Sequence, residues 1–277
     1  MSSVIALNPN KALWEKGDFT RIAAAMRESG DALVESLGIT PCMEILDLGC
    51  GDGTTALPAA RRGANVLGVD IAANLVAAGR ARAKAENLRS LHFQEGDASR
   101  LTGIESNSFD LVISIFGAMF APYPLDVASE MVRVTKPGGR IEMGNWIPGD
   151  PTLVAQILRI SAGYSPPPPP GFVSPMRWGV EEEVIERFGA AGVSREHIRC
   201  TRATYVFDHA GSPSSFLDLF QNYYGPTMNA FDAAWENGRL DQLRAELENL
   251  FAEQNVSRDP GRTRIPATYM RVSVDVV

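Results

Sequence analysis

Three glycines at alternate positions, Gly49, Gly51 and Gly53, are the residues of this sequence with the clearest chemical meaning. They follow the short apolar segment 44–48, which reads as a strand, and precede residues 54–62, which read as a helix. Glycine lets the backbone turn sharply and approach a ligand without a Cβ in the way. The first turn of the following helix offers unpaired N–H groups. The pattern predicts a strand-to-helix turn that holds a nucleotide-like cofactor.

Two carboxylates accompany this turn and help to choose between cofactors. Asp70 ends the second expected strand, 17 positions after Gly53, where an acid is the expected partner of two ribose hydroxyls. The glycine spacing is G-x-G-x-G and position 54 is Thr, unlike the G-x-G-x-x-G pattern of dinucleotide-binding proteins. Asp47 would repel a pyrophosphate but suits a cationic amino-acid head group. These features favour S-adenosylmethionine (SAM) over a nicotinamide cofactor.

The turn resembles motif I of the class I (Rossmann-like) SAM-dependent methyltransferases, in the branch that includes ubiquinone- and menaquinone-biosynthesis methyltransferases and many small-molecule methyltransferases. Further segments resemble that family in order, at residues 14–19, 68–71, 95–98, 109–117 and 136–139. The resemblance covers roughly residues 12–147 and fades beyond them, where acceptor specificity usually lies. It implies in-line transfer of a methyl group from SAM to an oxygen, nitrogen or carbon nucleophile of a small molecule, with S-adenosylhomocysteine as product.

The resemblance also assigns roles to single residues. It implies that Asp70 binds the ribose, Asp97 the adenine amine, and the amide of Ala98 an adenine ring nitrogen. Asp47 fits a cofactor contact, but also a helix cap or a buried structural acid. Cys50 is better explained as a small residue that fills space within the turn than as a nucleophile. The expected cofactor-binding residues are Phe19, Asp47, Gly49, Cys50, Gly51, Asp70, Ile71, Asp97, Ala98, Ile115 and Phe116.

The acceptor side is less well defined. Met119, Trp146, Tyr223 and Tyr224 are candidate substrate-binding residues, although each also fits a place in the core. His209 is the only one of the three histidines expected to face the acceptor, which makes it the candidate catalytic residue. A base is needed only if the acceptor must lose a proton. No obvious base stands out, so the use of one remains open.

The elements that must position these residues alternate between strand and helix. Strands are expected at residues 44–48, 65–69, 90–94, 109–115, 140–146, 202–207 and 267–276, with helices between them. The alternation predicts an α/β fold, a doubly wound, mostly parallel seven-stranded sheet with helices on both faces. We expect one domain over residues 1–277. Its parts are a helical cap at 1–40, a SAM-binding core at 41–148 and an acceptor-side region at 149–277, with a helical insertion at about 210–262 between the last two strands.

Composition excludes several other functions. The net charge of −7, without a run of more than two basic residues, argues against nucleic-acid binding. Three cysteines suggest neither a disulfide framework nor a zinc site, and no acidic cluster suggests a metal. No stretch of about 20 apolar residues suggests a membrane span, and the first residues do not resemble a signal peptide. A cytoplasmic location is therefore expected.

The insertion, with its aromatic residues, and the five prolines 166–170 suggest a lid over a modest apolar pocket. Such a pocket favours a small, partly hydrophobic acceptor, for example an aromatic or quinone-like metabolite. Two alternatives remain open on the sequence alone. One is a SAM-binding protein without catalytic activity, and the other is a nicotinamide-dependent oxidoreductase.

Overall fold

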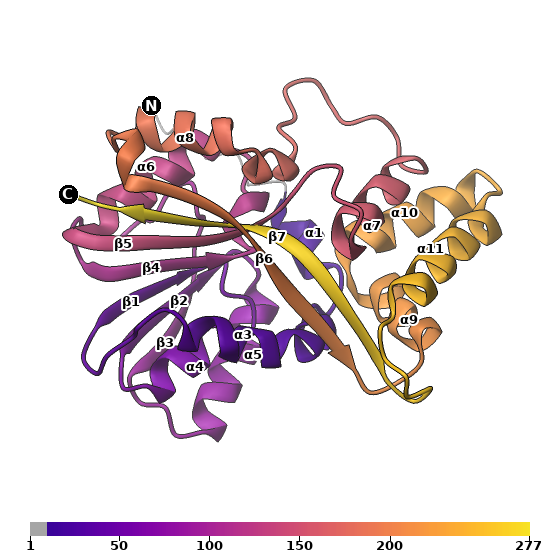
Figure 1. Ribbon diagram of the computed structural model, residues 1–277, viewed down its shortest axis with the longest axis horizontal. Helices are drawn as coiled ribbons and strands as arrows, with labels where there is room; N and C mark the ends of the chain where they lie inside the picture. The colour runs from indigo at the N-terminus through magenta and orange to yellow at the C-terminus, as the bar shows by residue number, and fades with distance from the viewer. Residues whose placement is uncertain (1–9) are drawn as a thin grey trace.

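The sheet at the centre of the computed structural model has seven strands in the order β3-β2-β1-β4-β5-β7-β6 (Figure 1). The structure describes residues 10–277, so the first nine residues of the expected cap lie outside it. Strand pairs from β3 to β5 are parallel, whereas β7 runs antiparallel to β5 and β6. The predicted mostly parallel α/β sheet is confirmed. The strands are β1 (Glu44–Leu48), β2 (Asn65–Asp70), β3 (Leu91–Glu95), β4 (Phe109–Ile115), β5 (Thr135–Trp146), β6 (Ile198–His209) and β7 (Thr263–Asp275).

Helices cover both faces of the parallel half of this sheet (Figure 1). Because neither face meets water, the central strands are apolar along almost their whole length. Leu46 of β1 and Leu111 and Val112 of β4 are fully buried. On one face lie α4 (Ala56–Arg61) and α5 (Ala73–Ala85), and on the other α6 (Pro124–Val134) and α8 (Glu181–Ala190).

Strand β5 begins five residues earlier than the sequence suggested. We expected the Lys-Pro-Gly-Gly segment at residues 136–139 to separate a helix from a strand starting at Arg140. It does end α6, but Thr135 already pairs with Phe109 of β4, and regular pairing resumes at Leu111 and Arg140. Gly138 adopts a φ of 81°, and its N–H donates to the carbonyl of Val276 at 2.6 Å. The segment is therefore an irregularity inside the strand.

The last two strands form a ribbon that extends beyond the rest of the sheet (Figure 1). Strand β5 pairs with β7 only as far as Trp146 and Tyr269, whereas β6 and β7 remain paired to His209 and Thr263. A helical cluster packs at the extended end, where Phe207, Phe216 and Phe251 bury their rings. The predicted insertion is thus present between β6 and β7, and α7 joins it. The helices of this cluster are α7 (Leu153–Ala162), α9 (Pro213–Tyr223), α10 (Gly225–Glu236) and α11 (Leu240–Gln254).

The N-terminal region forms several short helices rather than one long one. These are α1 (Asn10–Glu15), α2 (Thr20–Ala23), the 3₁₀ helix η1 (Ala24–Met26) and α3 (Arg27–Glu35). The break after α1 ends at Asp18, whose carboxylate accepts hydrogen bonds from the backbone N–H and the hydroxyl of Thr20. The hydroxyl of Ser29 donates to the carbonyl of Val206 and accepts a hydrogen bond from its N–H, each at 2.9 Å. Helix α3 thereby provides hydrogen-bond partners for backbone groups on the edge of β6. The region thereby closes over the end of the sheet.

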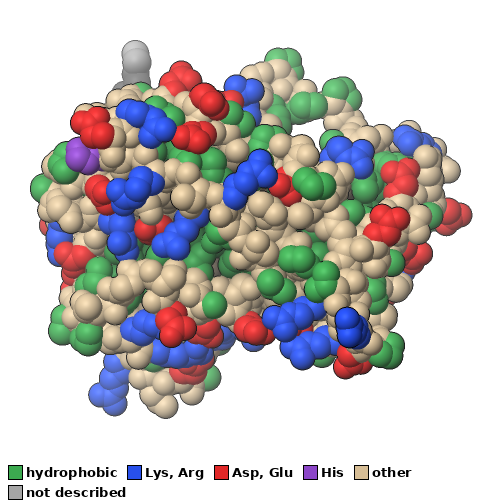
Figure 2. Space-filling view, viewed as in Figure 1, with side chains coloured by type: hydrophobic (Ala, Val, Ile, Leu, Met, Phe, Trp, Pro, Cys, Tyr) green, Lys and Arg blue, Asp and Glu red, His purple; other side chains and the backbone are tan. Residues whose placement is uncertain are grey.

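The described surface shows no concentration of one charge on the face in view. Lys and Arg side chains alternate there with Asp and Glu side chains (Figure 2). Among the described helices, none has both the length and the apolar character that crossing a bilayer requires.

Candidate functional site

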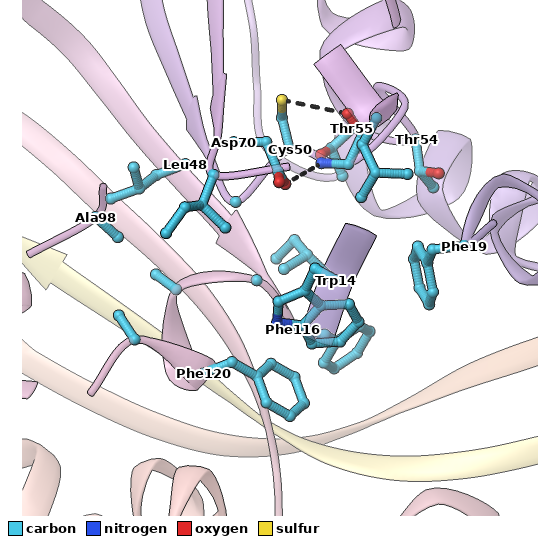
Figure 3. Close-up of a pocket in the computed structure, with 18 of the residues that line it drawn as sticks. Trp14, Phe19, Leu48, Cys50, Thr54, Thr55, Asp70, Ala98, Phe116 and Phe120 are labelled. Carbon is cyan, nitrogen blue, oxygen red and sulfur yellow. Dashed lines mark hydrogen bonds between the residues drawn. The ribbon is translucent and has the colours of Figure 1, made fainter. Parts of the chain in front are cut away.

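A cavity of about 930 Å³, partly open to solvent, lies at the carboxyl ends of β1, β2 and β4 (Figure 3). The chain leaves β1 toward β2 and β3 and returns on the other side of β1 as β4, so the loops after β1 and β4 diverge there. Such a switch point is where open α/β sheets bind ligands. The cavity is therefore the candidate ligand-binding site.

The glycine turn forms one wall of this cavity. Gly49, Gly51 and Gly53 have φ values of 69°, 56° and 88°, in the left-handed region that glycine tolerates best. A Cβ on Gly49 would lie 2.6 Å from the Cα of Gly117, so that glycine lets the loops after β1 and β4 touch. A Cβ on Gly51 would meet nothing within 4 Å, which leaves room beside the turn. The turn therefore has the open cradle that a bound cofactor requires.

Asp70 connects the glycine turn to the start of α5. Its carboxylate is buried and accepts hydrogen bonds from the N–H of Gly51 at 2.8 Å and of Ala72 at 2.9 Å. Burial raises the pKa of Asp70, and these N–H groups partly oppose the rise. A carboxylate can accept about four hydrogen bonds, so capacity remains for a hydroxyl donor from a ligand. Asp70 lines the cavity and fits the ribose-binding role expected of it.

Asp47 lies behind the cavity wall. Its Oδ2 accepts a hydrogen bond from the hydroxyl of Thr55 at 2.5 Å, and Thr55 lines the cavity. Its Oδ1 is buried without a partner. Burial raises the pKa of Asp47 to about 7, although the Thr55 hydroxyl favours the ionised form. Asp47 therefore reaches the cavity through Thr55, and its ionisation is poorly stabilised.

The other expected cofactor-binding residues lie together on the cavity lining. Asp97 and Ala98 follow β3, and the Asp97 carboxylate accepts a hydrogen bond from the N–H of Ser99 at 2.8 Å. Cys50 is buried, and burial raises the pKa of its thiol, as befits a filler of the turn. Apart from Asp47, every residue of the expected set is present: Phe19, Gly49, Cys50, Gly51, Asp70, Ile71, Asp97, Ala98, Ile115 and Phe116.

A third buried carboxylate, Asp52, was not expected from the sequence. It is 1% exposed and lies 3.2 Å from Nη2 of Arg27 and 3.1 Å from Nη1 of Arg82. The two arginines come from α3 and α5, so Asp52 fixes the glycine turn to helices on either side of it. Only the tertiary fold brings these three residues together.

Aromatic and apolar side chains form the opposite wall (Figure 3). The Trp14 ring centroid lies 5.8 Å from that of Phe19 and 4.9 Å from that of Phe120, both in edge-to-face geometry. Met26 and Tyr205 also line this side, and the Tyr205 hydroxyl donates to the Met26 carbonyl at 3.0 Å. Trp14 belongs to a segment that carried the resemblance, but no sequence signal identified Met26 or Tyr205, which are joined only by the fold.

The acceptor-side candidates lie outside the cavity lining. Met119, Trp146 and Tyr224 are buried, and Tyr223 is half-buried. The ring of Tyr224 packs against Trp14 at 5.9 Å, so it supports the wall from outside. His209 also lies away from the lining. Its Nε2 is 3.1 Å from the Ser215 hydroxyl, and its ring stacks on Phe216. The structure therefore places His209 in the packing of the insertion.

The segment 10–19, rather than the insertion, covers the cavity. On the cofactor side, Lys11 pairs with Glu95 at 2.9 Å, and the Glu15 carboxylate accepts a hydrogen bond from the N–H of Ala73 at 3.0 Å. On the other side, Lys16 donates to Asn229 and Asp232 of α10, at 2.6 Å each. The prolines 166–170 are exposed and do not line the cavity. The expectation that the insertion and the prolines form the lid is thus wrong, because the insertion packs outside the segment 10–19.

The charged residues among the described lining residues are all acidic. Asp52, Asp70 and Asp97 contribute carboxylates, whereas no Lys, Arg or His is among the described residues that line the cavity. SAM carries a sulfonium and an ammonium group, and a wall of carboxylates and aromatic faces suits such cations. The open cradle at Gly51 and the spare capacity of Asp70 fit the same molecule.

Comparison with known sequences agrees with this geometry. A family model described as "Methyltransferase domain" matches residues 46–143. The uncharacterised protein Rv1403c of Mycobacterium tuberculosis is 34% identical over 249 residues, which cover 88% of this chain and 87% of that protein. The ubiquinone biosynthesis O-methyltransferase of Acinetobacter baumannii is 32% identical over 98 residues, which cover 35% of this chain and 41% of that enzyme.

Solved structures share the fold at low sequence identity. The YcgJ protein of Bacillus subtilis has a TM-score of 0.59 at 17% identity, over 90% of this chain and 99% of that one. The phosphoethanolamine N-methyltransferase 2 of Haemonchus contortus, in complex with S-adenosyl-L-methionine, has a TM-score of 0.60 at 16% identity, over 99% of this chain and 61% of that one. With the site geometry and the family match, these comparisons lead to one conclusion: the chain is a methyltransferase with the fold of the class I SAM-dependent enzymes.

Proposed function

We propose that this methyltransferase acts on a small, partly hydrophobic acceptor that carries no negatively charged group. The observation that carries the proposal is the apolar wall of Trp14, Phe19, Phe120 and Met26 opposite the glycine turn. An aromatic wall of this kind binds apolar molecules through buried area and ring contacts. A phosphate or carboxylate would find no cationic partner among the described lining residues.

In this proposal the cofactor occupies the half of the cavity nearest the glycine turn. Asp70 binds the ribose hydroxyls, Asp97 and the amide of Ala98 hold the adenine, and Asp47 acts through Thr55 near the amino-acid end. When bound there, SAM supplies a methyl group already activated by its sulfonium. The protein then has to align the acceptor and exclude water, which supplies much of the acceleration in such reactions.

The relatives favour different acceptors, and the cavity helps to choose between them. The enzyme of Acinetobacter baumannii is named for ubiquinone biosynthesis and O-methylation, and its likeness to this chain supports an aromatic hydroxyl compound as the first class to test. A solved complex of the Haemonchus contortus enzyme contains phosphomonomethylethanolamine, which is phosphorylated. The lack of basic residues on the described lining argues against such an acceptor here.

The proposal also includes a cytoplasmic site of reaction. Cys42, Cys50 and Cys200 are free thiols in the structure, as is usual in a reducing compartment.

An acceptor screen tests the proposed function. Purified protein and SAM would be incubated with neutral phenols and quinols, and with phosphorylated amines of similar size, while release of S-adenosylhomocysteine is measured. We expect turnover with members of the first group, loss of turnover in Asp70→Ala, and no turnover with the second group. Turnover confined to the phosphorylated amines would refute the proposed acceptor class and leave the methyltransferase assignment intact.

A further inference from the structure

A second pocket lies at the edge of the sheet, between helix α5 and strand β3, and is called the edge pocket below (Figure 1). Strand β3 is the outermost strand on the parallel side of the sheet. Among the described residues, none lines both the edge pocket and the cavity at the glycine turn. The edge pocket is therefore separate from the proposed cofactor site.

The charged residues on the lining of the edge pocket are all basic. Arg80 and Lys84 lie on α5, Arg89 lies in the turn before β3, and His92 lies on β3 itself. No Asp or Glu is among the described residues that line this pocket. Because the whole chain has a net charge of −7, a lining that combines three cations with no acid is a local departure from the composition.

The turn between α5 and β3 brings these groups to one place. Asn87 adopts a φ of 55°, and the N–H of Leu88 donates to the carbonyl of Ala83 at 3.0 Å, a common way to end a helix. The chain then returns beside α5 as β3. Arg80 and Lys84 are one helical turn apart, so their side chains share the face of α5 that borders the edge pocket.

The acids nearest to the edge pocket along the chain pair with other residues. Glu86, just after α5, forms a bidentate pair with Arg61 at 2.7 and 2.8 Å. Glu95, at the end of β3, binds Lys11 at 2.9 Å. Neither carboxylate is therefore available to neutralise the cations of the edge pocket.

Two of these cations have no ionic partner, and the third is held in place. Lys84 and Arg89 are exposed and form no ion pair within residues 10–277. Arg80 donates from Nε and Nη2 to the carbonyl of Phe93, at 3.0 and 2.7 Å, which fixes its guanidinium group against β3. A guanidinium group has five N–H donors, so three remain for a ligand.

We propose that the edge pocket binds a small molecule through a diphosphate group. This inference goes beyond the proposed function and does not depend on the methyl acceptor. Guanidinium and ammonium groups are the usual protein partners of phosphate oxygens. One terminal phosphate carries about 1.5–2 negative charges at pH 7, so three cations match a diphosphate more closely than a single phosphate.

Titration with sodium pyrophosphate tests the edge pocket directly. Binding would be followed by phosphorus NMR on protein saturated with S-adenosylhomocysteine, which keeps the other cavity occupied, and at low ionic strength, because salt screens exposed charges. We expect saturable binding to the wild type. Arg89→Gln and Lys84→Gln should each weaken it by about two- to fivefold, as for exposed charge pairs, and the double variant by about the product of the two effects.

A matched variant separates the edge pocket from the effect of net charge. Arg258 is also exposed and forms no ion pair within residues 10–277, but it lies outside the edge pocket. Arg258→Gln makes the same change in net charge as Arg89→Gln and should bind pyrophosphate like the wild type. All these variants should keep the wild-type affinity for S-adenosylhomocysteine, which shows that they are folded.

A second titration, with ADP, identifies the source of the diphosphate. Tighter binding of ADP than of pyrophosphate, weakened by Arg89→Gln, would assign the edge pocket to nucleotides, and otherwise to other diphosphates. Absence of saturable binding of both compounds to the wild type would overturn the proposal. An equal loss of affinity in Arg258→Gln and Arg89→Gln would overturn it too, as would tighter binding of a single-stranded oligonucleotide than of ADP, which would indicate a nucleic-acid surface.

Discussion

At the scale of single residues, the buried acid Asp47 gives the clearest pH dependence. Its carboxyl group ionises near pH 3.8 when exposed and near pH 7 in the folded chain, because burial raises its pKa. The folded state therefore retains a proton that the unfolded state has lost between these two values. The stability contributed by this group is complete below about pH 4 and declines as the pH rises to about 7, by at most about 1.4 kcal/mol per pH unit.

Asp47→Asn should remove this decline. We expect the melting temperature of the cofactor-free variant to change less between pH 5 and pH 8 than that of the wild type. Calorimetric scans at a series of pH values would measure it. Asp126→Asn, which changes an exposed acid on α6, is the control and should keep the wild-type profile. A wild-type profile in Asp47→Asn as well would show that another group titrates in this range.

Asp70 tests the proposed cofactor contacts. Its two oxygens hold the N–H groups of Gly51 and Ala72, and the proposal adds two ribose hydroxyls. Asn offers only one acceptor atom and no charge, and hydrogen bonds to charged groups contribute about 1.5–3 kcal/mol each. Asp70→Asn should therefore weaken S-adenosylhomocysteine binding by at least about tenfold in calorimetry. An affinity within twofold of the wild type would remove Asp70 from the cofactor site.

Site residues that directly follow a recognisable strand could be predicted from the sequence. Site residues that come together only in the folded structure could not. Gly49, Gly51 and Asp70 follow strands that could be read from their apolar residues, so their meeting at one edge of the sheet was predictable. Tyr205 reaches the cavity from β6 and binds Met26, 179 positions earlier in the chain. No local pattern encodes such a pairing.

At the scale of elements, the segment 10–19 is the cover of the cavity, and its two ends are held differently. Lys11 and Glu15 bind the cofactor side, whereas Lys16 binds Asn229 and Asp232 of α10. A ligand of the size of SAM has to pass this segment to reach the glycine turn. We therefore expect the contacts of Lys16 to slow the release of the bound ligand while they contribute little to the free energy of unfolding.

Lys16→Met should speed the release of S-adenosylhomocysteine. Partly exposed ion pairs contribute about 0.2–1 kcal/mol, so we expect dissociation to accelerate by up to about fivefold with little change in melting temperature. Stopped-flow displacement would measure it, and Trp14 supplies a fluorescent reporter in the cover itself. Arg61→Met, which breaks a bidentate pair between Arg61 at the end of α4 and Glu86 just after α5, is the control. Equal dissociation rates in both variants and the wild type would show that Lys16 does not restrain the cover.

The sequence predicted where the insertion lies but not what it covers. Its helices were recognisable from amphipathic spacing between two strands, and they are present between β6 and β7. Their role as a lid was an inference from their aromatic residues. Those residues instead pack against the ribbon and against each other, as Phe216 does with Phe207 and Phe251. A side chain's type alone does not distinguish a pocket wall from a core.

At the scale of the whole molecule, the segment 10–19 near the start of the chain and the insertion near its end meet beside a cavity that is lined largely by residues between 48 and 121. Gly225, at the start of α10, packs on the carbonyl of Leu13 in α1, and Gly17 packs on the carbonyl of Tyr223. These close approaches bring the insertion against the cover. The expected single domain would then unfold as one unit, with cover, insertion and sheet lost together.

Gly225→Ala should weaken this assembly as a whole. Its new Cβ would collide with the Leu13 carbonyl, which is backbone and cannot rotate away, and overpacking of this kind costs about 1–3 kcal/mol. We expect the free energy of unfolding in urea to fall by that amount and S-adenosylhomocysteine affinity to fall with it, because the displaced α1 carries Trp14. Gly189→Ala, in α8, meets nothing within 4 Å and should leave affinity unchanged and stability equal or higher. If Gly225→Ala lost stability but kept full affinity, the insertion would support the ribbon alone, and the cover would close independently of it.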